Sequence, residues 1–225
     1  MIFGGFQRTS LMDFPGRVAS IVFVAGCNMR CHYCHNPDLV FMKATNIPES
    51  AILSEMKKRK RYIDSIVVTG GEPTIWHDLP DFLSRLRGLG LMIKLDTNGT
   101  SPEMLGKIIE SRLADYVAMD IKAPWSKYER VVGVKTEIES IKRSASVLRE
   151  SGIDYEFRTT LAPELNAGDI EGIARQISPA KRWYLQRFVK GSTVGRTGSA
   201  ALGLNEVNAV LAKISGIQAA ALRGF

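Results

Sequence analysis

The sequence predicts a single-domain α/β fold built around a parallel sheet. Short apolar runs rich in β-branched residues alternate with longer segments in which apolar residues recur at helical spacing. This alternation favours parallel βαβ units with right-handed crossovers. No linker or low-complexity segment interrupts the 225 residues. We therefore expect one domain over residues 1–225, with a core at about 10–190 and a C-terminal helix and tail at 191–225.

Strands and helices are expected in strict alternation. The strands are expected at residues 18–25, 66–69, 92–96, 116–120, 155–161 and 183–188. The helices are expected at residues 48–61, 79–89, from 101 onward, 136–152, near 169–177 and 205–214. Ser101 followed by Pro102 is typical of a helix start, and Thr136 with Glu139 predicts a capping box. Residues 217–222 fit either a strand or a tail.

The composition is that of a soluble globular chain, with 45% hydrophobic residues. No stretch approaches the roughly 20 apolar residues that a membrane span needs. The first ten residues lack the charged region and apolar run of a signal peptide. We therefore expect a cytoplasmic protein with reduced thiols and no membrane partner.

The formal net charge is +7, and residues 57–61 form the one concentrated basic run, Lys-Lys-Arg-Lys-Arg. The run closes an expected helix, where cations complement the macrodipole, so a solvated helix end is the favoured interpretation. A docking patch and an RNA contact are the alternatives. Nucleic acid is not an expected partner, because no aromatic residues are interleaved with the run as single-strand binding requires.

All three cysteines, Cys27, Cys31 and Cys34, lie within eight positions directly after the first expected strand. An odd number on one loop argues against a disulfide framework, and soft thiolates select iron–sulfur clusters, zinc or Cu(I). A zinc site of three cysteines with His32 or His35 is one alternative. A cubane cluster held by three cysteines leaves one iron open to a substrate, and the spacing favours it.

Further polar and glycine-rich signals follow the expected strands, where parallel α/β folds gather their ligand groups. These signals are Gly70-Gly71-Glu72 after the second strand, Asp96-Thr97-Asn98-Gly99 after the third and Asp120-Ile121-Lys122 after the fourth, with Arg158 and Gln186 inside the last two. A purely structural fold does not need thiolates, carboxylates, an amide and a lysine on one rim. The sequence therefore predicts an active site there.

The motif Cys27-x-x-x-Cys31-x-x-Cys34, with Tyr33 before the last cysteine, resembles the cluster motif of radical S-adenosylmethionine (SAM) enzymes. Two further motifs, Cys34-His35-Asn36 and Asp13-Phe14-Pro15-Gly16, resemble the subgroup that activates glycyl radical enzymes. Within it the likeness is to the activating protein of anaerobic ribonucleoside-triphosphate reductase, with the pyruvate formate-lyase activating enzyme a near relative. The likeness runs from about residue 10 to 188, and it is most specific at the cysteines and at Gly70-Gly71-Glu72-Pro73.

The resemblance implies an open partial (βα)6 barrel, the radical SAM core. It implies a [4Fe-4S] cluster on Cys27, Cys31 and Cys34 and a SAM molecule on the open iron. The expected SAM contacts are Tyr33 at the adenine, Gly70, Gly71, Glu72 and Pro73 at the methionine amino group, Asn98 and Asp120 at the ribose, and Lys122 and Arg158 at the carboxylate. Asp96, Thr97 and Asp120 are expected to form a monovalent cation site. His35 and Asn36 would support the loop, and Asp13 would border the site mouth.

The implied reaction is reductive cleavage of SAM to a 5′-deoxyadenosyl radical, which removes hydrogen from a backbone glycine of a glycyl radical enzyme. The implied partners are anaerobic ribonucleotide reductase and a flavodoxin or ferredoxin as electron donor. No cysteine beyond the three is present, which argues against auxiliary clusters. One alternative is a radical SAM enzyme acting on a small molecule or nucleotide, as in deazapurine formation. The second is a non-enzymatic zinc-binding module.

Overall fold

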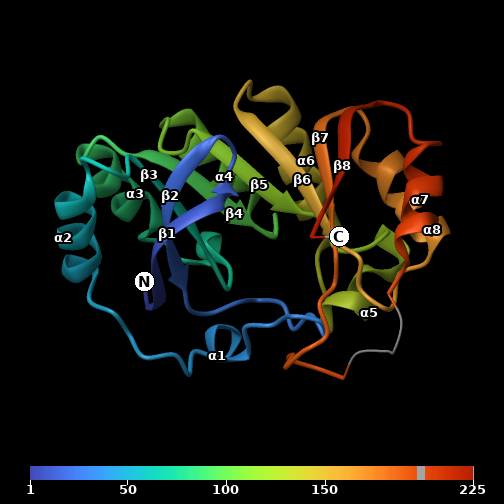
Figure 1. Cartoon of the computed structure of the whole chain (residues 1–225), viewed down its shortest axis with the longest axis horizontal. Helices are drawn as coiled ribbons and strands as arrows, with labels where there is room; N and C mark the ends of the chain where they lie inside the picture. The colour runs from blue at the N-terminus through green and yellow to red at the C-terminus, as the bar shows by residue number, and fades with distance from the viewer. Residues whose placement is uncertain (197–200, 225) are drawn as a thin grey trace.

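The computed structural model describes residues 1–196 and 201–224, and its core is one curved eight-stranded sheet (Figure 1). Strand order in the sheet follows chain order from β1 to β8. All neighbours from β2 to β8 pair in parallel, and β1 pairs antiparallel with β2. The strands are β1 (Phe3–Phe14), β2 (Arg17–Val24), β3 (Ser65–Gly70), β4 (Met92–Thr97), β5 (Tyr116–Asp120), β6 (Asp154–Thr160), β7 (Ala180–Gln186) and β8 (Ile217–Arg223).

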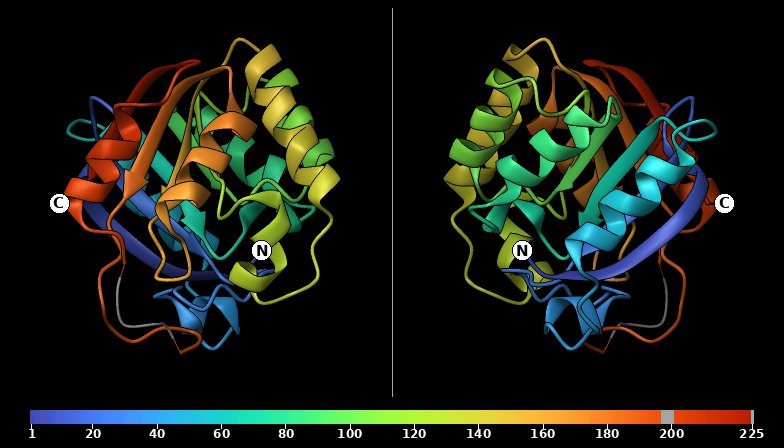
Figure 2. Two further views of the ribbon diagram at one scale, coloured as in Figure 1. Left: turned by 90° about the vertical axis from the view of Figure 1, so that its right-hand side faces the viewer. Right: turned by 90° about the vertical axis from the view of Figure 1, so that its left-hand side faces the viewer.

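Most of the helices lie outside the curve of the sheet and cover its convex face, while α1 (Pro37–Val40) lies below the sheet, apart from that layer (Figure 2). The other helices are α2 (Glu49–Arg59), α3 (Leu79–Gly88), α4 (Pro102–Glu110), α5 (Tyr128–Val132), α6 (Ile138–Glu150), α7 (Ala167–Ile177) and α8 (Leu204–Leu211), with short 3₁₀ turns η1 (Pro73–Ile75) and η2 (Trp125–Lys127). Their apolar stripes share one core with the outward side chains of the strands, as Leu83 and Ile108 do with Val68 and Val117. Burial of these stripes is the main force that holds the layers together.

The predicted α/β fold with an open partial barrel is confirmed. Strands β2 to β7 are the six expected strands, within a few residues at each end. The two strands at the edges of the sheet extend this core. Residues 217–222, which fit either a strand or a tail in the sequence, form strand β8. Strand β1 was missed because its sequence carries Gly4, Gly5 and a polar stretch instead of an apolar run.

The predicted capping box at Thr136 and Glu139 is wrong. Helix α6 begins at Ile138 after Glu137, and the Thr136 hydroxyl donates to the carbonyl of Val134 at 3.2 Å. Glu137 lies at the N-cap, and its carboxylate accepts a hydrogen bond from Ser140 Oγ at 2.9 Å.

A capping box is present instead at the start of α7. The backbone N–H of Asp169 donates to the Asn166 side chain at 3.0 Å, and that of Asn166 donates to Asp169 at 2.8 Å. The start of α4 at Ser101 and Pro102 is confirmed, although no hydrogen bond from the helix reaches the Ser101 side chain.

A second, smaller core lies on the concave face of the sheet, toward the amino ends of the strands. This apolar floor consists of Phe14, Ala19, Ile21, Val67 and Tyr116, each at most 6% exposed. Side chains alternate along a strand, so these residues point away from the helices and into the barrel. The floor closes the interior at the end opposite the predicted site.

The turn that carries Asp13 lies at the amino end of β2, because Phe14 pairs with Arg17 at the start of that strand. The cysteines follow the other end of β2. The expectation that Asp13 borders the mouth at the carboxyl ends of the strands is therefore wrong. Among the described residues, none of the helices has the length and apolar character needed to cross a membrane.

Candidate active site

A cavity of about 390 Å³ opens at the carboxyl ends of the parallel strands. Its walls come from the cysteine loop (residues 26–37), the turns after β3, β4 and β5, and the ends of β6 and β7. The predicted site residues that line it are Cys27, Tyr33, Cys31, Cys34, Gly70, Gly71, Glu72, Asn98, Asp120, Lys122 and Arg158, together with Asp96, Thr97 and Gln186. Pro73 does not line the cavity, because it is buried at the start of η1.

The cysteine loop turns all three thiols toward this cavity. Gly26 begins the loop with a φ of 87°, a left-handed conformation that glycine adopts without strain. The backbone N–H of Cys34 then donates to the carbonyl of Cys31 at 3.0 Å, which makes the second half a tight turn. Burial raises the pKa of Cys27 to about 12 and also raises the pKa of Cys31. Because thiolates are the ligands of iron, metal binding must displace protons from these groups.

The two histidines of the loop each contact another group, and His35 also lines the cavity. His32 Nδ1 lies 3.9 Å from a carboxylate oxygen of Glu164, while His35 Nδ1 lies 3.2 Å from the carbonyl oxygen of Ser192. The His35 ring also stacks on Phe188. In residues 1–196 and 201–224, no three His, Cys, Asp or Glu side chains are arranged to hold a metal ion. Because both histidines contact other groups, three thiols facing one cavity favour a larger cluster over a Cys₃His zinc site.

The two glycines of the turn after β3 are required by close packing against the cysteine loop. A Cβ on Gly71 would lie 1.9 Å from the carbonyl oxygen of Gly26, and one on Gly70 would lie 2.4 Å from the backbone of Val24. The N–H of Gly71 donates to Val24 at 2.7 Å, and that of Glu72 donates to Gly26 at 2.8 Å. These N–H groups are thus used within the fold, which leaves carbonyl oxygens as the turn's polar groups for a ligand.

Glu72 joins the turn after β3 to the turn after β4. Its carboxylate accepts hydrogen bonds from Thr74, from the Thr97 hydroxyl at 2.7 Å and from the Asn98 N–H at 2.5 Å. Burial raises the pKa of Glu72, and these donors act in the opposite direction. The side chain is therefore a link between two turns of the rim.

Asn98 extends this link to the cysteine loop. Its amide Nδ2 donates to the Asn28 side chain at 2.9 Å, and Asn28 donates in turn to Thr100 at 2.8 Å. Sequence reasoning missed Asn28, which stands directly after the first cysteine. Its place inside the motif was the signal that could have found it. The amide pair fixes the first half of the loop relative to β4.

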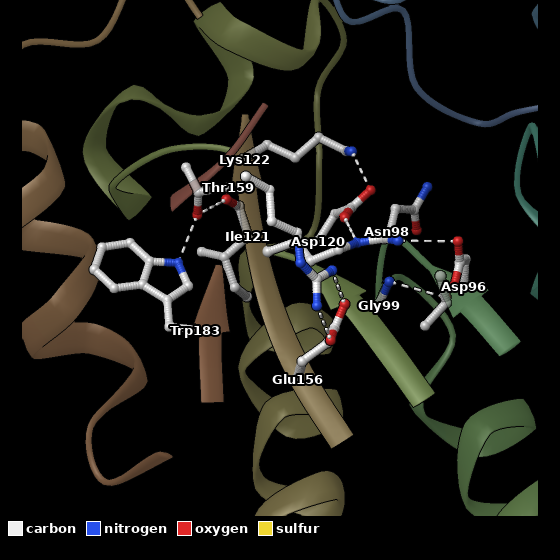
Figure 3. A network of polar contacts seen from close by, with 12 residues as sticks. Asp96, Asn98, Gly99, Asp120, Ile121, Lys122, Glu156, Thr159 and Trp183 are labelled. Atoms are coloured by element: carbon white, nitrogen blue, oxygen red, sulfur yellow. Dashed lines mark hydrogen bonds and ion pairs between the residues drawn. The ribbon is translucent and has the colours of Figure 1, made fainter. Parts of the chain in front are cut away.

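Opposite the thiols, a chain of ion pairs spans three strands (Figure 3). Lys122 Nζ lies 3.0 Å from Asp120, and the Arg158 guanidinium bridges Asp120 at 2.8 Å and Asp96 at 3.0 Å. Burial alone would raise the pKa of Asp120, but Arg158 and Lys122 outweigh it and lower that pKa to about 2. Burial likewise opposes the charge of Lys122, yet Asp120 raises its pKa well above the usual value. Both groups therefore stay charged.

Lys94 adds a third cation to this chain, since its Nζ lies 2.5 Å from Asp96. The side chain is 2% exposed, and alternation along β4 puts it on the same face as Asp96. That spacing is the signal by which Lys94 could have been found. Asp96 and Asp120 together face three cations, so these carboxylates carry no excess negative charge for the expected monovalent cation. The geometry does not favour a cation site there.

A second buried carboxylate, Glu156, lies one step closer to the apolar floor (Figure 3). It is 0% exposed, and Arg223 of β8 binds it through two hydrogen bonds of 2.8 and 2.9 Å. Tyr116 donates to the same carboxylate at 2.8 Å. The pair fastens β8 to the centre of the barrel. Sequence reasoning missed it because residues 217–222 read equally as a tail.

Comparison with known proteins decides the family. The model of the radical SAM superfamily matches residues 21–177, which is more than half of the chain. The chain belongs to the radical SAM superfamily. The predictions of a radical SAM enzyme, with a [4Fe-4S] cluster and SAM as its cofactors, are confirmed at this level. Both groups fit the cavity, since its lining supplies three thiols for iron and, in Lys122 and Arg158, positive charge for a carboxylate.

Individual proteins show which members of the radical SAM superfamily this chain is similar to. The chain is 32% identical over 190 residues to a protein of Methanocaldococcus jannaschii provisionally named a glycyl-radical enzyme activating enzyme, covering 82% of this chain and 78% of that protein. It is 31% identical over 170 residues to the pyruvate formate-lyase-activating enzyme of Streptococcus mutans, covering 70% and 64%. It is also 30% identical over 206 residues to the 7-carboxy-7-deazaguanine synthase of Geobacter sulfurreducens, covering 72% and 79%.

A solved structure shares the fold. The crystal structure of Streptococcus suis SuiB bound to S-adenosylmethionine superimposes with a TM-score of 0.70 at 14% identity, over 91% of this chain. The chain spans about half the length of SuiB, 52%. At this identity the likeness extends to the fold alone.

Proposed function

We propose that this chain activates an anaerobic glycyl radical enzyme by cleaving SAM reductively and removing a hydrogen atom from one backbone glycine of that partner. The observation that carries the proposal is the meeting of three thiols, Lys122, Arg158 and a glycine turn in one cavity. The M. jannaschii relative, similar over 82% of the chain, supports the activase role. The motifs at residues 13–16 and 34–36 favour the activase subgroup, and the resemblance from about residue 10 to 188 favours anaerobic ribonucleoside-triphosphate reductase as the partner.

Cys27, Cys31 and Cys34 would hold the [4Fe-4S] cluster. When bound, the cluster supplies the one electron that breaks a carbon–sulfur bond of SAM, giving methionine and a 5′-deoxyadenosyl radical. That radical would take the glycine hydrogen, which would leave 5′-deoxyadenosine and a glycyl radical on the partner. The electron comes from a reduced flavodoxin or ferredoxin, which we propose as the donor.

The remaining rim residues would bind and orient SAM. Lys122 and Arg158 offer positive charge to its carboxylate, and their pairing with Asp120 holds both side chains in place. Carbonyl oxygens at Gly70 and Gly71 suit the amino group. The backbone N–H groups of Gly71 and Glu72 are already bound, so an acceptor-rich turn remains.

The nucleoside half of SAM would lie against Tyr33, Asn98 and Asp120. Tyr33 is buried in the cavity wall, where its ring and backbone can meet an adenine. The Asn98 amide carries two hydrogens, and Asn28 takes one of them, so the other can serve a ribose hydroxyl. Asp120 also lines the cavity and can accept from the ribose.

Reconstitution tests the chemistry. The protein is loaded anaerobically with iron and sulfide, reduced with dithionite and mixed with SAM, and 5′-deoxyadenosine is followed by chromatography. We expect product from the wild type and none from Cys31→Ala, since the cluster would lose one of its three ligands. Stoichiometric zinc binding without SAM cleavage would overturn the enzyme assignment and would favour the zinc-binding module instead.

A second candidate is a small purine-like substrate, because the G. sulfurreducens deazaguanine synthase is similar over 72% of the chain. Electron paramagnetic resonance separates the two. The reconstituted protein is mixed with purified anaerobic ribonucleotide reductase and SAM under reduction. A glycyl radical signal on the reductase supports the activase. SAM cleavage with no radical on the reductase supports the small-molecule candidate.

A further inference from the structure

An exposed apolar patch lies on the outer side of the cysteine loop. This entry patch consists of Phe41, Met42 and Ile75, whose exposed fractions are 43%, 55% and 42%. It touches the residue next to the first cysteine, since a Cβ on Gly26 would lie 3.5 Å from both Met42 Sδ and Ile75 Cδ1. Large apolar side chains exposed together mark interaction surfaces.

The patch is attached directly to the backbone that carries the cysteines. The Arg30 guanidinium donates to the carbonyl oxygens of Cys27 at 2.6 Å and Met29 at 2.8 Å. The same guanidinium carbon lies 5.1 Å from the centre of the Phe41 ring, and Lys43 Nζ lies 5.9 Å from it. Two cations therefore flank the aromatic centre of the patch at the loop itself.

Residues 188–196 form a strap along the other half of the cysteine loop. The backbone N–H of Val194 donates to Cys34 at 2.9 Å, and that of Gly195 donates to His32 at 3.0 Å. Figures 1 and 2 show this segment beside the cysteine loop, away from the helix layer. The strap contains exposed Lys190 and Arg196 and no acidic residue.

Positive charge therefore dominates both sides of the loop. Its cations are Arg30, Lys43, Lys190 and Arg196. Residues 26–43 contain one acid, Asp38, and Glu164 faces His32 at 3.9 Å. An apolar centre with a basic rim complements an acidic protein surface, both for steering and for docking.

We propose that the entry patch and the strap form the docking surface for a small acidic electron-carrier protein. This inference rests on the proposed function, which consumes one electron for each SAM cleaved. The reduced carrier loses that electron and the cluster gains it, with no bond formed or broken. A carrier docked there is separated from the cysteines by little more than the loop backbone. Phe41, Met42 and Ile75 do not line the SAM cavity, whereas the strap borders it through Phe188 and Val189.

Charge reversal tests the surface with a matched control. The double variant Lys43→Glu with Lys190→Glu changes the proposed rim, and Lys57→Glu with Lys58→Glu makes the same charge change on exposed positions of α2. Binding of purified oxidised flavodoxin is measured by calorimetry at low and high salt. SAM cleavage is then measured with reduced flavodoxin and, separately, with dithionite, which needs no docking.

We expect the rim variant to bind flavodoxin about tenfold more weakly at low salt and to lose most of the salt dependence. Its flavodoxin-driven cleavage falls in parallel, while dithionite-driven cleavage and the α2 variant match the wild type. Phe41→Ala, which keeps every charge, should also weaken binding.

Three results would overturn the docking surface: no flavodoxin binding by the wild type, unchanged binding by the rim variant, or a larger loss in the α2 variant. A wild type that binds flavodoxin but never cleaves SAM with dithionite would instead contradict the proposed function, and the calorimetry would still decide the surface.

Discussion

The two ends of the barrel interior are held by different forces. At the amino ends of the strands, the apolar floor is packed from side chains such as Phe14, Ile21 and Val67. At the carboxyl ends, Asp96, Asp120 and their cations form a partly buried ionic chain. A buried ion pair contributes little net stability compared with packed apolar groups. The difference indicates that the floor stabilises the fold, and the proposed function assigns ligand binding to the ionic rim.

The largest effect of a single substitution is expected where the turn after β3 meets the cysteine loop. Gly71→Ala would force a methyl group to within 1.9 Å of the Gly26 carbonyl, so the loop must shift. We expect this variant to lose most of its iron after anaerobic reconstitution, at a cost of about 3 kcal/mol in strain. Iron and sulfide analysis measures the loss.

Gly106→Ala is the matched control, because a Cβ there meets open space on helix α4. It should keep full iron content and gain about 0.5–1 kcal/mol of stability. Full iron content in Gly71→Ala would show that the close approach of the two turns does not matter for the cluster.

Removing Arg158, the central cation of the rim, should destabilise the fold by more than its intact ion pairs stabilise it. Arg158→Leu leaves Asp96 and Asp120, which are partly buried, with one cation fewer, so we expect a loss of about 3 kcal/mol, the low end for broken buried pairs. SAM affinity should fall as well. Chemical denaturation and equilibrium dialysis measure the two effects.

Arg158→Lys keeps the charge and should recover part of both losses. Wild-type stability in Arg158→Leu would contradict the ionic chain as drawn. Wild-type SAM affinity would remove Arg158 from the proposed SAM site and leave Lys122 as the cation for the carboxylate.

A variant in the apolar floor should lose stability and keep its SAM affinity. Ile21→Ala removes a side chain that is 3% exposed and leaves a cavity, so we expect a loss of about 2–4 kcal/mol. SAM affinity and 5′-deoxyadenosine yield at low temperature should match the wild type. A large loss of SAM affinity in a protein that is still folded would show that the two ends are coupled, against the separation of roles.

The smallest effect is a dependence of stability on pH. The folded-state pKa of Asp120, about 2, lies below the value of about 3.9 for an unfolded chain. Its ion pairs therefore stabilise fully above about pH 4, and this contribution, on the order of 2 kcal/mol, is lost as the pH falls toward 2. Denaturation of the cluster-free protein between pH 5 and 2 measures it.

Asp120→Asn should flatten this part of the pH profile. Asp154→Asn is the control, because its side chain is 62% exposed and its ion pair to Arg182 is screened by solvent. Equal profiles for Asp120→Asn and the wild type would show that another acid carries the dependence.

The sequence predicted the parts of this molecule that local patterns encode. The six core strands carry apolar runs, and the cysteine motif specifies its own loop. Partnerships between distant residues were not readable, because no local pattern encodes them: Asn28 with Asn98, Lys94 with Asp96, and Glu156 with Arg223. Strand β1 was missed because it pairs through its backbone with few apolar side chains to mark it.

The most direct test of the central claim follows the abstracted hydrogen. Anaerobic ribonucleotide reductase is prepared with glycine deuterated at the α carbon and treated with the reconstituted protein, reductant and SAM. Mass spectrometry of the 5′-deoxyadenosine should then show one deuterium per molecule, together with a glycyl radical signal on the reductase. Unlabelled 5′-deoxyadenosine with no radical on the reductase would contradict the claim that this chain takes hydrogen from the reductase's glycine.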